Sequence, residues 1–422
     1  MRFILSGLIL LLVISNILQL DMSLGPGLSA KNAVLYIAGS SIAFRLAVSR
    51  NFKLEMGQFI AVFLAFLVYA IATWLVAGLF IEYKGYSLLK SGIILKSNLL
   101  DQLIFFLTFF YGTLNSQDAI KTLKVILIGV VLINLANLGD AFNIYSLGNY
   151  MEEDGRMAGP IGEPNDYGAF IVMFLPPLFA AMVTSRGLAR LWWALAIAVS
   201  LAALLTTASR AAFVAVLLSM AIGAYSLRRY LPAEKVLPWL AKAAVAGLIV
   251  GFVVSIEFGQ LLYSRLVGES QTVSVATLSS GRTEFWSGLI SQMMAHPITL
   301  LTGFGWNTYE TMGFYFAAHN YYLALWFNLG LPGLILGTTI LVIPMRTARR
   351  AIDQADSIYK PYLIAFVFTI IATLIVVFFA EIFVPWQYFW AYAGLAMRLA
   401  IDATRKSSTV TSNKPAANAL MT

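Results

Sequence analysis

The sequence predicts an all-α fold: a polytopic membrane helical bundle of about twelve transmembrane helices, with a large outer loop that contains an amphipathic helix. Hydrophobic residues make up 60% of the 422 positions and charged residues only 11%. The charged fraction is well below the roughly 25% that is usual in soluble domains. The mean hydropathy is correspondingly high, at +0.81. Long apolar runs recur along the whole chain, and lysines and arginines gather in alternate connections between them. These observations indicate a protein embedded in a lipid bilayer.

The apolar runs are long enough, or nearly so, to cross the hydrocarbon layer, which takes roughly 20 helical residues. The last two runs flank a tight hairpin at Glu381 to Pro385. We expect membrane helices near residues 3–20, 31–48, 57–80, 99–115, 122–138, 166–184, 188–207, 211–227, 236–256, 320–344, 361–380 and 382–400.

The distribution of positive charge predicts how these helices are oriented. If the N-terminus lies inside, 20 of the 28 lysines and arginines fall on the inner side and eight on the outer side. Cytoplasmic loops carry this kind of excess, so both termini are expected in the cytoplasm. A connection with Lys84, Lys90 and Lys96 runs against the bias. The N-terminal run shows no clear cleavage site, so we expect it to be retained as the first helix.

Two long polar connections are expected on the outer side. The first, residues 139–165, contains a series of turn-forming residues. In the second, about residues 257–318, apolar side chains from Phe285 to Met294 repeat at helical spacing before Pro297. This spacing predicts an amphipathic helix that lies on the membrane surface or caps the bundle.

The remaining connections are too short to hold a soluble domain. We therefore expect one membrane-embedded domain over residues 1–406. Residues 407–422 are polar and aperiodic, which predicts a disordered cytoplasmic tail.

Composition also excludes several kinds of chemistry. The chain has no cysteine and two histidines, which rules out disulfides, thiolate catalysis and a histidine-rich metal site. The run Glu152-Glu153-Asp154 could ligate a divalent ion, but consecutive carboxylates point in different directions, so a solvated loop is favoured. We expect no metal and no cofactor. The formal charge of +8 reflects membrane orientation rather than nucleic-acid binding.

Arg210 is the strongest candidate for a binding residue. It follows Ser209 at the expected outer start of a helix, where the helix dipole and the orientation rule both disfavour a positive charge. An anionic ligand held by the planar guanidinium would offset that cost, and phosphate suits its paired donors. The alternative is an interfacial arginine whose charge reaches lipid headgroups.

Three further outer arginines are weaker candidates. Arg282 follows Ser280-Gly281 at the start of the amphipathic helix, where free backbone N–H groups favour an anion, although a surface arginine there is often only solvated. Arg265 is placed to pair with Glu269, four residues along a helical turn. Arg156 is also placed to offset the acidic run that precedes it.

His319 lies where the second polar connection re-enters the membrane. Imidazole is the side chain best matched to accepting a proton near neutral pH. The alternative is an interface histidine that caps its helix, with Tyr321 and Tyr322 as aromatic anchors.

These residues carry a resemblance to a known family. Arg156 with Gly159 and Pro164-Asn165, Ser209-Arg210, Ser280-Gly281-Arg282 with Trp286, Gly303-x-Gly305, and His319-Asn320-x-Tyr322-Leu323 with Gly330-x-x-Gly333 resemble motifs of the O-antigen ligase and O-antigen polymerase superfamily. The resemblance is strongest from about 195 to 345. It implies a bacterial inner-membrane glycosyltransferase with a periplasmic site.

The resemblance also implies a substrate class and residue roles. The donor would be a glycan on undecaprenyl diphosphate, and the acceptor either the lipid A core oligosaccharide or a second carrier-linked repeat unit. Arg210 and Arg282 match diphosphate-binding arginines, with Arg265 and Arg156 as further candidates. His319 matches an essential histidine, and Asn165, Asn320 and Tyr322 become candidates for the donor or acceptor pocket.

Two other functions compete with this hypothesis. Twelve helices also suit a transporter of lipid-linked glycans, but the spans show no inverted repeat and are almost free of charge apart from Asp101 and Glu381 near helix ends. Transport sites usually lie at the bilayer midplane with broken helices and buried ions. A membrane scaffold is the third possibility, which the two elaborate outer loops disfavour.

Overall fold

The apolar runs form long helices in the computed structural model of the protein, which describes residues 1–49, 54–145, 147–148, 150–231, 233–267, 282–314, 318–380 and 384–412. Each of the twelve predicted runs contains a helix. The long helices are α1 (Arg2–Ile17), α2 (Ala30–Val48), α3 (Gly57–Val76), α5 (Asp101–Gly112), α6 (Ser116–Ala141), α7 (Pro164–Thr184), α8 (Gly187–Thr206), α9 (Arg210–Ser226), α10 (Ala233–Val267), α14 (Tyr321–Ala351), α15 (Lys360–Val376) and α16 (Val384–Ser412).

Short elements complete the described chain. They are the hairpin β1 (Ser23–Gly25) and β2 (Leu28–Ser29), the π-helical turns η1 (Ala77–Ile81) and η2 (Lys96–Leu100), the helices α4 (Leu88–Leu95), α12 (Arg282–Ala295) and α13 (Thr299–Thr302), and the 3₁₀ turns η3 (Gly159–Ile161) and η4 (Tyr309–Met312).

Seven helical segments of the described residues have the length and hydropathy of a membrane span, and three further apolar helices are shorter. The seven are Gly57–Ile81, Leu88–Gly112, Ser116–Ala141, Pro164–Thr184, Gly187–Thr206, Gly247–Ser264 and Tyr321–Ala351. The all-α membrane bundle is therefore confirmed, while the count of twelve crossings stays a prediction.

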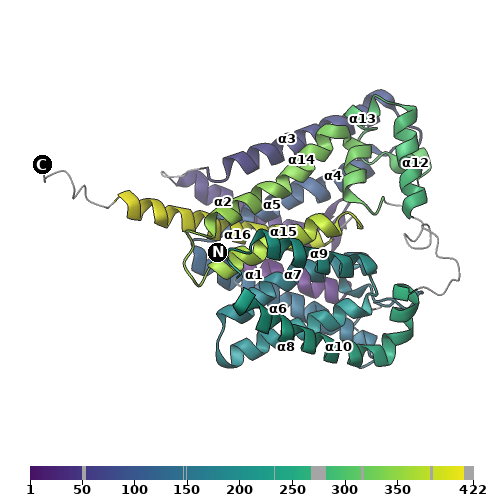
Figure 1. The fold of residues 1–422 in the computed structure, drawn as a ribbon. Coiled ribbons are helices and arrows are strands. Elements are labelled where there is room, and N and C mark those ends of the chain that lie inside the picture. The colour runs from purple at the N-terminus through teal and green to yellow at the C-terminus, as the bar shows by residue number, and fades with distance from the viewer. Residues whose placement is uncertain are drawn as a thin grey trace, which may run out of the picture.

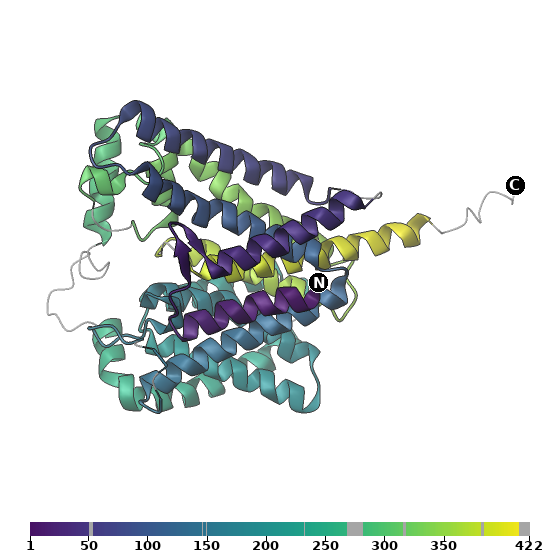
Figure 2. The ribbon, with the colours of Figure 1, turned by 180° about the vertical axis from the view of Figure 1, so that it is seen from behind.

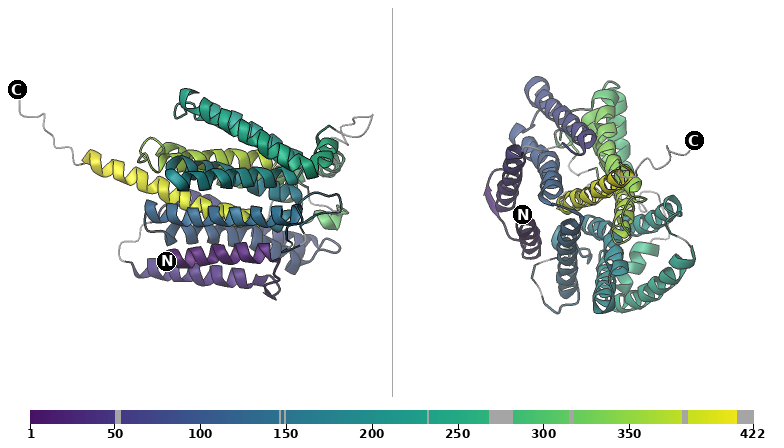
Figure 3. Two further views of the ribbon diagram at one scale, coloured as in Figure 1. Left: turned by 90° about the horizontal axis from the view of Figure 1, so that it is seen from below. Right: turned by 90° about the vertical axis from the view of Figure 1, so that its left-hand side faces the viewer.

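The long helices run side by side, with α15 and α16 between two groups (Figure 1). One group contains α2, α3, α5 and α14, and the other contains α1 and α6 to α10. The start of α1 and the C-terminal part of α16 lie at one end of the bundle, and α12 and α13 lie at the other (Figures 2 and 3). The central position of α16 explains why Tyr388, Phe389 and Tyr392 are fully buried.

Two predicted boundaries were wrong. The helix predicted at 99–115 already begins at Leu88 and continues through η2 to Gly112. Lys96 therefore belongs to a helix rather than to a loop. Its charge is satisfied there, because its Nζ lies 3.0 Å from the Asp101 carboxylate and donates to the Gly27 carbonyl at 2.7 Å. Likewise α10 runs on to Val267, past the predicted loop start at Glu257. The ring of Phe258 packs on Phe142 and keeps this extension against the bundle.

The predicted amphipathic helix is confirmed as α12. Its residues Leu289 and Met293 are buried, and Phe285 and Trp286 pack beside them against the start of α14. The predicted disordered tail from residue 407 differs from the structure, since α16 continues to Ser412. Residues 413–422, and residues 381–383 of the hairpin predicted at Glu381 to Pro385, lie outside the described residues.

A kink in α14 receives the loop that leads back from α13. Gly330 has φ +62°, and a Cβ there would lie 2.2 Å from the carbonyl oxygen of Leu301. The kink leaves the carbonyls of Phe327 and Asn328 to accept hydrogen bonds from the N–H groups of Phe304 and Gly305, both at 2.9 Å. Gly303 and Gly330 therefore allow two backbones to meet.

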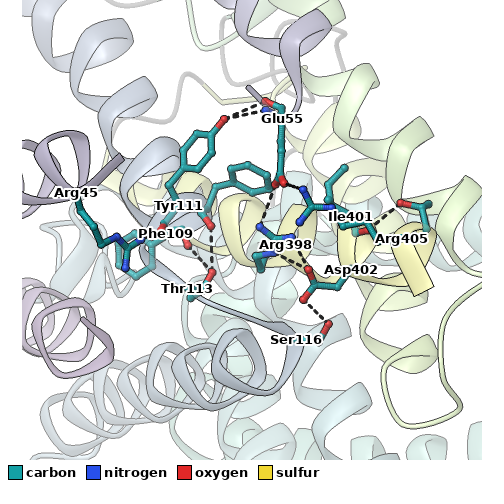
Figure 4. A network of polar contacts seen from close by, with 12 residues as sticks. Arg45, Glu55, Phe109, Tyr111, Thr113, Ser116, Arg398, Ile401, Asp402 and Arg405 are labelled. Carbon is teal, nitrogen blue, oxygen red and sulfur yellow. Dashed lines mark hydrogen bonds and ion pairs between the residues drawn. The ribbon is translucent and has the colours of Figure 1, made fainter. Parts of the chain in front are cut away.

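The end of the bundle near the termini holds a network of ion pairs (Figure 4). Arg398 on α16, only 6% exposed, contacts Glu55 at 3.0 Å and also pairs with Asp402. Arg405 pairs with the other oxygen of Glu55, and Ser116 donates to Asp402 at 3.0 Å. The network joins α16 to the start of α3 and the start of α6.

Candidate functional site: a cavity lined by arginines

The loop between α6 and α7 folds back as a tight turn. The backbone of Glu152 bonds Arg156 at 2.8 Å, and Gly155, at φ +78°, closes the turn. Met157 donates to the carbonyl of Thr206 at the end of α8 at 3.1 Å. This pairing presents the acidic run and Arg156 beside the connection between α8 and α9.

Asn165, in the first turn of α7, links two candidate arginines. Its side-chain oxygen accepts from Arg156 Nη2 at 3.2 Å and from Ser209 Oγ at 2.9 Å. Ser209 in turn caps α9, whose first residue is Arg210. Arg156 Nε also donates to the Thr207 carbonyl at 3.0 Å, and its guanidinium lies 3.9 Å from Asp154. Arg156 thus does more than offset the acidic run.

Arg282 is the first described residue of α12, and its Nη1 donates to the carbonyl of Phe379 at 2.7 Å. Phe379 lies in the turn that follows α15, so this bond connects the start of α12 to the end of α15. The side chain is half-buried rather than fully solvated.

His319 precedes α14 and adopts φ +46°, a left-handed conformation that is uncommon for residues other than glycine. The neighbouring carbonyl of Ala318 accepts from Trp286 Nε1 at 2.8 Å, and Tyr321 N–H donates to Val377 at 2.8 Å. Bonds on both sides therefore hold the imidazole in a strained position, which is frequent at functional sites.

Asn320 and Tyr322, both expected in the pocket, have structural contacts instead. The side chain of Asn320 caps α14 by accepting from Leu323 N–H at 3.0 Å. The hydroxyl of Tyr322 donates to the Leu374 carbonyl at 2.6 Å. The residue that caps α14 is thus Asn320 and not His319.

One cavity of about 870 Å³ brings the other candidates together. We call it the arginine cavity. Its volume falls within the usual range for ligand pockets, roughly 300–1,000 Å³. Trp286, Phe379 and Val214 contribute apolar surface. The lining also contains Asn165 and the ionisable side chains of Glu152, Glu153, Asp154, Arg156, Glu163, Arg210, Arg282 and His319.

The charges in the cavity influence one another. Burial lowers the pKa of Arg282, while the Glu163 carboxylate raises it and the Arg210 guanidinium lowers it. Burial also lowers the pKa of His319, which Glu163 raises and Arg282 lowers. A lowered pKa favours the neutral imidazole, which is the form that can accept a proton. The Arg210 guanidinium is thus close enough to Arg282 to disfavour its charged form, which a bound anion would favour.

Glu163 was not among the residues selected from the sequence. It stands before Pro164-Asn165, in a stretch whose turn-forming residues predict an irregular loop. A carboxylate two residues before a motif asparagine was the available signal. Arg265 lies near the end of α10, but its side chain and its expected partner Glu269 fall outside the described part of the chain.

Within the described residues, no three histidine, aspartate or glutamate side chains converge into a group that could hold a metal ion. The carboxylates of the run Glu152-Glu153-Asp154 are spread along a turn and do not converge on one point.

Fold and cavity together define a multi-pass membrane protein with an arginine-lined cavity at one end of its bundle. Residues 195–338 match the family described as O-antigen ligase, which confirms the resemblance to the O-antigen ligase superfamily. The match covers about a third of the chain and includes Arg210, Arg282 and His319, whereas Arg156 and Asn165 precede it. No curated protein matches the chain. The family implies an enzyme of the ligase or polymerase type that acts on lipid-linked glycans in a membrane.

Proposed function

We propose that the protein is a metal-independent, inverting glycosyltransferase that moves a glycan from undecaprenyl diphosphate to a sugar hydroxyl, with the lipid A core oligosaccharide as acceptor. The observation that carries the proposal is the arginine cavity, where Arg210, Arg282 and His319 line one space. The site would face the periplasm of the bacterial inner membrane, with both chain termini in the cytoplasm.

The arginines would stabilise the leaving group. Breaking the bond between the sugar and the diphosphate releases negative charge, and preorganised guanidinium donors are most effective where such charge develops. Arg210 and Arg282 are the leading candidates for this role. They are neighbours, because the charge of Arg210 lowers the pKa of Arg282. Arg156 is oriented by the side chain of Asn165, and Arg265 is a further candidate.

His319 would act as the general base. Its neutral imidazole takes the proton of the acceptor hydroxyl while that oxygen attacks the anomeric carbon from the face opposite the diphosphate, which inverts the configuration. The bond broken in the donor supplies the free energy, so neither a nucleotide nor a cofactor takes part.

The test is transfer by the purified protein in detergent, with a diphosphate-linked repeat unit and core lipid, and without ATP. We expect a new glycosidic product by mass spectrometry, and near-complete loss of it in Arg210→Lys, because a point charge cannot reproduce the guanidinium fork. Arg186→Lys, an exposed arginine before α8, is the matched control. Normal transfer by Arg210→Lys would contradict the assigned role.

A second variant, His319→Ala, tests the role of the histidine. His319→Ala should keep donor binding and stop turnover, because the base contributes to the reaction and not to the grip on the diphosphate. Loss of binding with unchanged turnover would make His319 structural. A product absent from all samples but transport of the donor across vesicles would instead favour a transporter.

The acceptor is decided by competition. Core lipid and a second carrier-linked repeat are offered together, and the masses of the products are compared. Exclusive extension of the carrier-linked repeat would identify a polymerase rather than a ligase.

A further inference from the structure

Glu163 occupies a rigid position on the wall of the arginine cavity. Its backbone adopts φ −67° and ψ 148°, the extended conformation favoured before a proline, and Pro164 then begins α7. Its carbonyl accepts the N–H of Tyr167 at 2.9 Å. The carboxylate makes no capping hydrogen bond to the helix, although an acidic residue at this place often does so. Its backbone is thus fixed while its charge remains directed at the cavity.

The charges that face His319 come from four parts of the chain. The loop before α7 contributes Glu152, Glu153, Asp154 and Arg156, the start of α7 contributes Glu163, α9 contributes Arg210, and α12 contributes Arg282. Of these, Arg282 opposes protonation of the imidazole and Glu163 favours it. A cavity that gathers arginines for a diphosphate would otherwise work against its own base, since that base must become a cation during the reaction.

We propose that Glu163 is a positioning residue that keeps the His319 imidazole able to accept a proton beside the arginines, and that the diphosphate of the bound donor adds to this effect. The inference rests on the proposed transferase function and assigns a role to a residue outside the motifs.

The proton balance of the step is simple. The acceptor oxygen forms its bond to the anomeric carbon, its proton moves to the His319 imidazole, and the diphosphate leaves with the electron pair of the broken C–O bond. The resulting imidazolium lies beside the Glu163 carboxylate until its proton passes to water. Without Glu163 the cation would face Arg282 with less compensation.

Donor binding changes the same balance. A doubly esterified diphosphate carries two negative charges, and held by Arg210 and Arg282 it screens the arginine that disfavours the imidazolium. His319 thus becomes a stronger base only when a donor is present, which protects the cavity from protonation while it is empty.

The test measures the titration of the two histidine side chains directly. Protein labelled with ¹³C-histidine gives two imidazole signals, and His296→Gln assigns the one from His319. We expect the pKa of His319 to fall by about one unit in Glu163→Gln. It should rise when a farnesyl diphosphate-linked sugar with a methylene in place of the glycosidic oxygen is added. This probe keeps its charge across the titration and cannot be transferred.

Glu284→Gln is the matched control, because it removes the same charge from an exposed position on α12 outside the cavity lining. Glu163→Asp should restore most of the shift. An unchanged His319 pKa in Glu163→Gln would overturn the role of Glu163, and an unchanged pKa on addition of the probe would overturn the effect of the donor.

Transfer assays separate this inference from the proposed function. If the wild-type protein transfers glycan and Glu163→Gln has an unaltered pH profile, the function stands and the role of Glu163 fails. If Glu163→Gln shifts the His319 titration but no variant transfers glycan, the charge coupling stands and the transferase function fails.

Discussion

The two ends of the bundle use arginine in opposite ways. Near the termini, Arg398 and Arg405 contact the carboxylates of Glu55 and Asp402, so charges of opposite sign meet within the chain. In the arginine cavity, Arg282 instead donates to a backbone carbonyl and lies in the field of Arg210. Paired charges hold helices together, whereas the neighbouring guanidinium groups of Arg210 and Arg282 favour a ligand that brings the opposite sign.

Because of this difference, mutations in the ion-pair network and in the arginine cavity should have different effects. Substitution in the network should lower stability and leave the turnover of folded molecules intact. Substitution in the cavity should do the reverse, because a site built for a ligand contributes little to the fold without that ligand.

The largest expected effect is on the cavity side. Arg282→Ala should lower kcat/KM for transfer by roughly 100- to 1,000-fold, as loss of one preorganised donor to developing charge does. Transfer is measured by product mass, and thermal stability in detergent is measured on the same sample. We expect the stability to change little. A loss of stability equal to that of a network variant would remove the distinction between the two regions.

The network variant Arg398→Ala is the converse experiment. It leaves Glu55 and Asp402 without their buried partner, which costs about 3 kcal/mol, the lower bound for removing one member of a buried pair. We expect a clear drop in the thermal unfolding temperature and normal turnover per folded molecule.

Arg405→Ala provides the matched control for this variant. The Arg405 side chain is 54% exposed, so its ion pair with Glu55 should contribute no more than about 1 kcal/mol. Equal destabilisation by both substitutions would show that burial does not set the strength of the network.

A smaller effect is expected from Asn165→Ala, which sharpens the comparison inside the cavity. Its side-chain oxygen joins Arg156 to Ser209, and loss of one or two such hydrogen bonds costs about 1–2 kcal/mol. Transfer should fall roughly tenfold by this magnitude, mainly through KM. Asn165→Asp keeps the acceptor oxygen and should retain more activity. Wild-type kinetics in Asn165→Ala would mean that Arg156 takes no part in binding.

The sequence predicted the helical bundle well because a membrane span has a strong signature in length and hydropathy. It failed where a charge is neutralised by a distant partner. Lys96 was assigned to a loop because one of its two contacts, the carbonyl of Gly27, is 69 residues away in the chain, although Asp101 is only five residues along. The same limit concealed the network, because Glu55 and Arg398 are separated by most of the chain.

Motifs identified the arginines and His319 as candidates, and the structure brings Arg156, Asn165, Arg210, Arg282 and His319 to one cavity. Motif membership did not separate residues that face the cavity from residues that hold the backbone. Asn320 and Tyr322 neighbour His319 in sequence, yet helical rotation directs them to a cap and to the carbonyl of Leu374. Glu163 was missed because its role depends on which charges surround it in space.

The smallest expected effect is on pH dependence. His319 must be neutral to accept a proton, so activity is lost as pH falls through its pKa. Burial and Arg282 lower that pKa against the raising effect of Glu163, so the acidic limb of kcat/KM should lie below about 6.5, the ordinary value for histidine. His296→Gln should leave the limb unchanged, since His296 is exposed outside the cavity lining. The limb of kcat, which reports the donor-bound enzyme, should lie at higher pH than that of kcat/KM, because the diphosphate offsets the arginines. A limb that moves with His296, or one that lies above 6.5 in the free enzyme, would mean that the cavity does not tune its histidine in the way its gathered charges require.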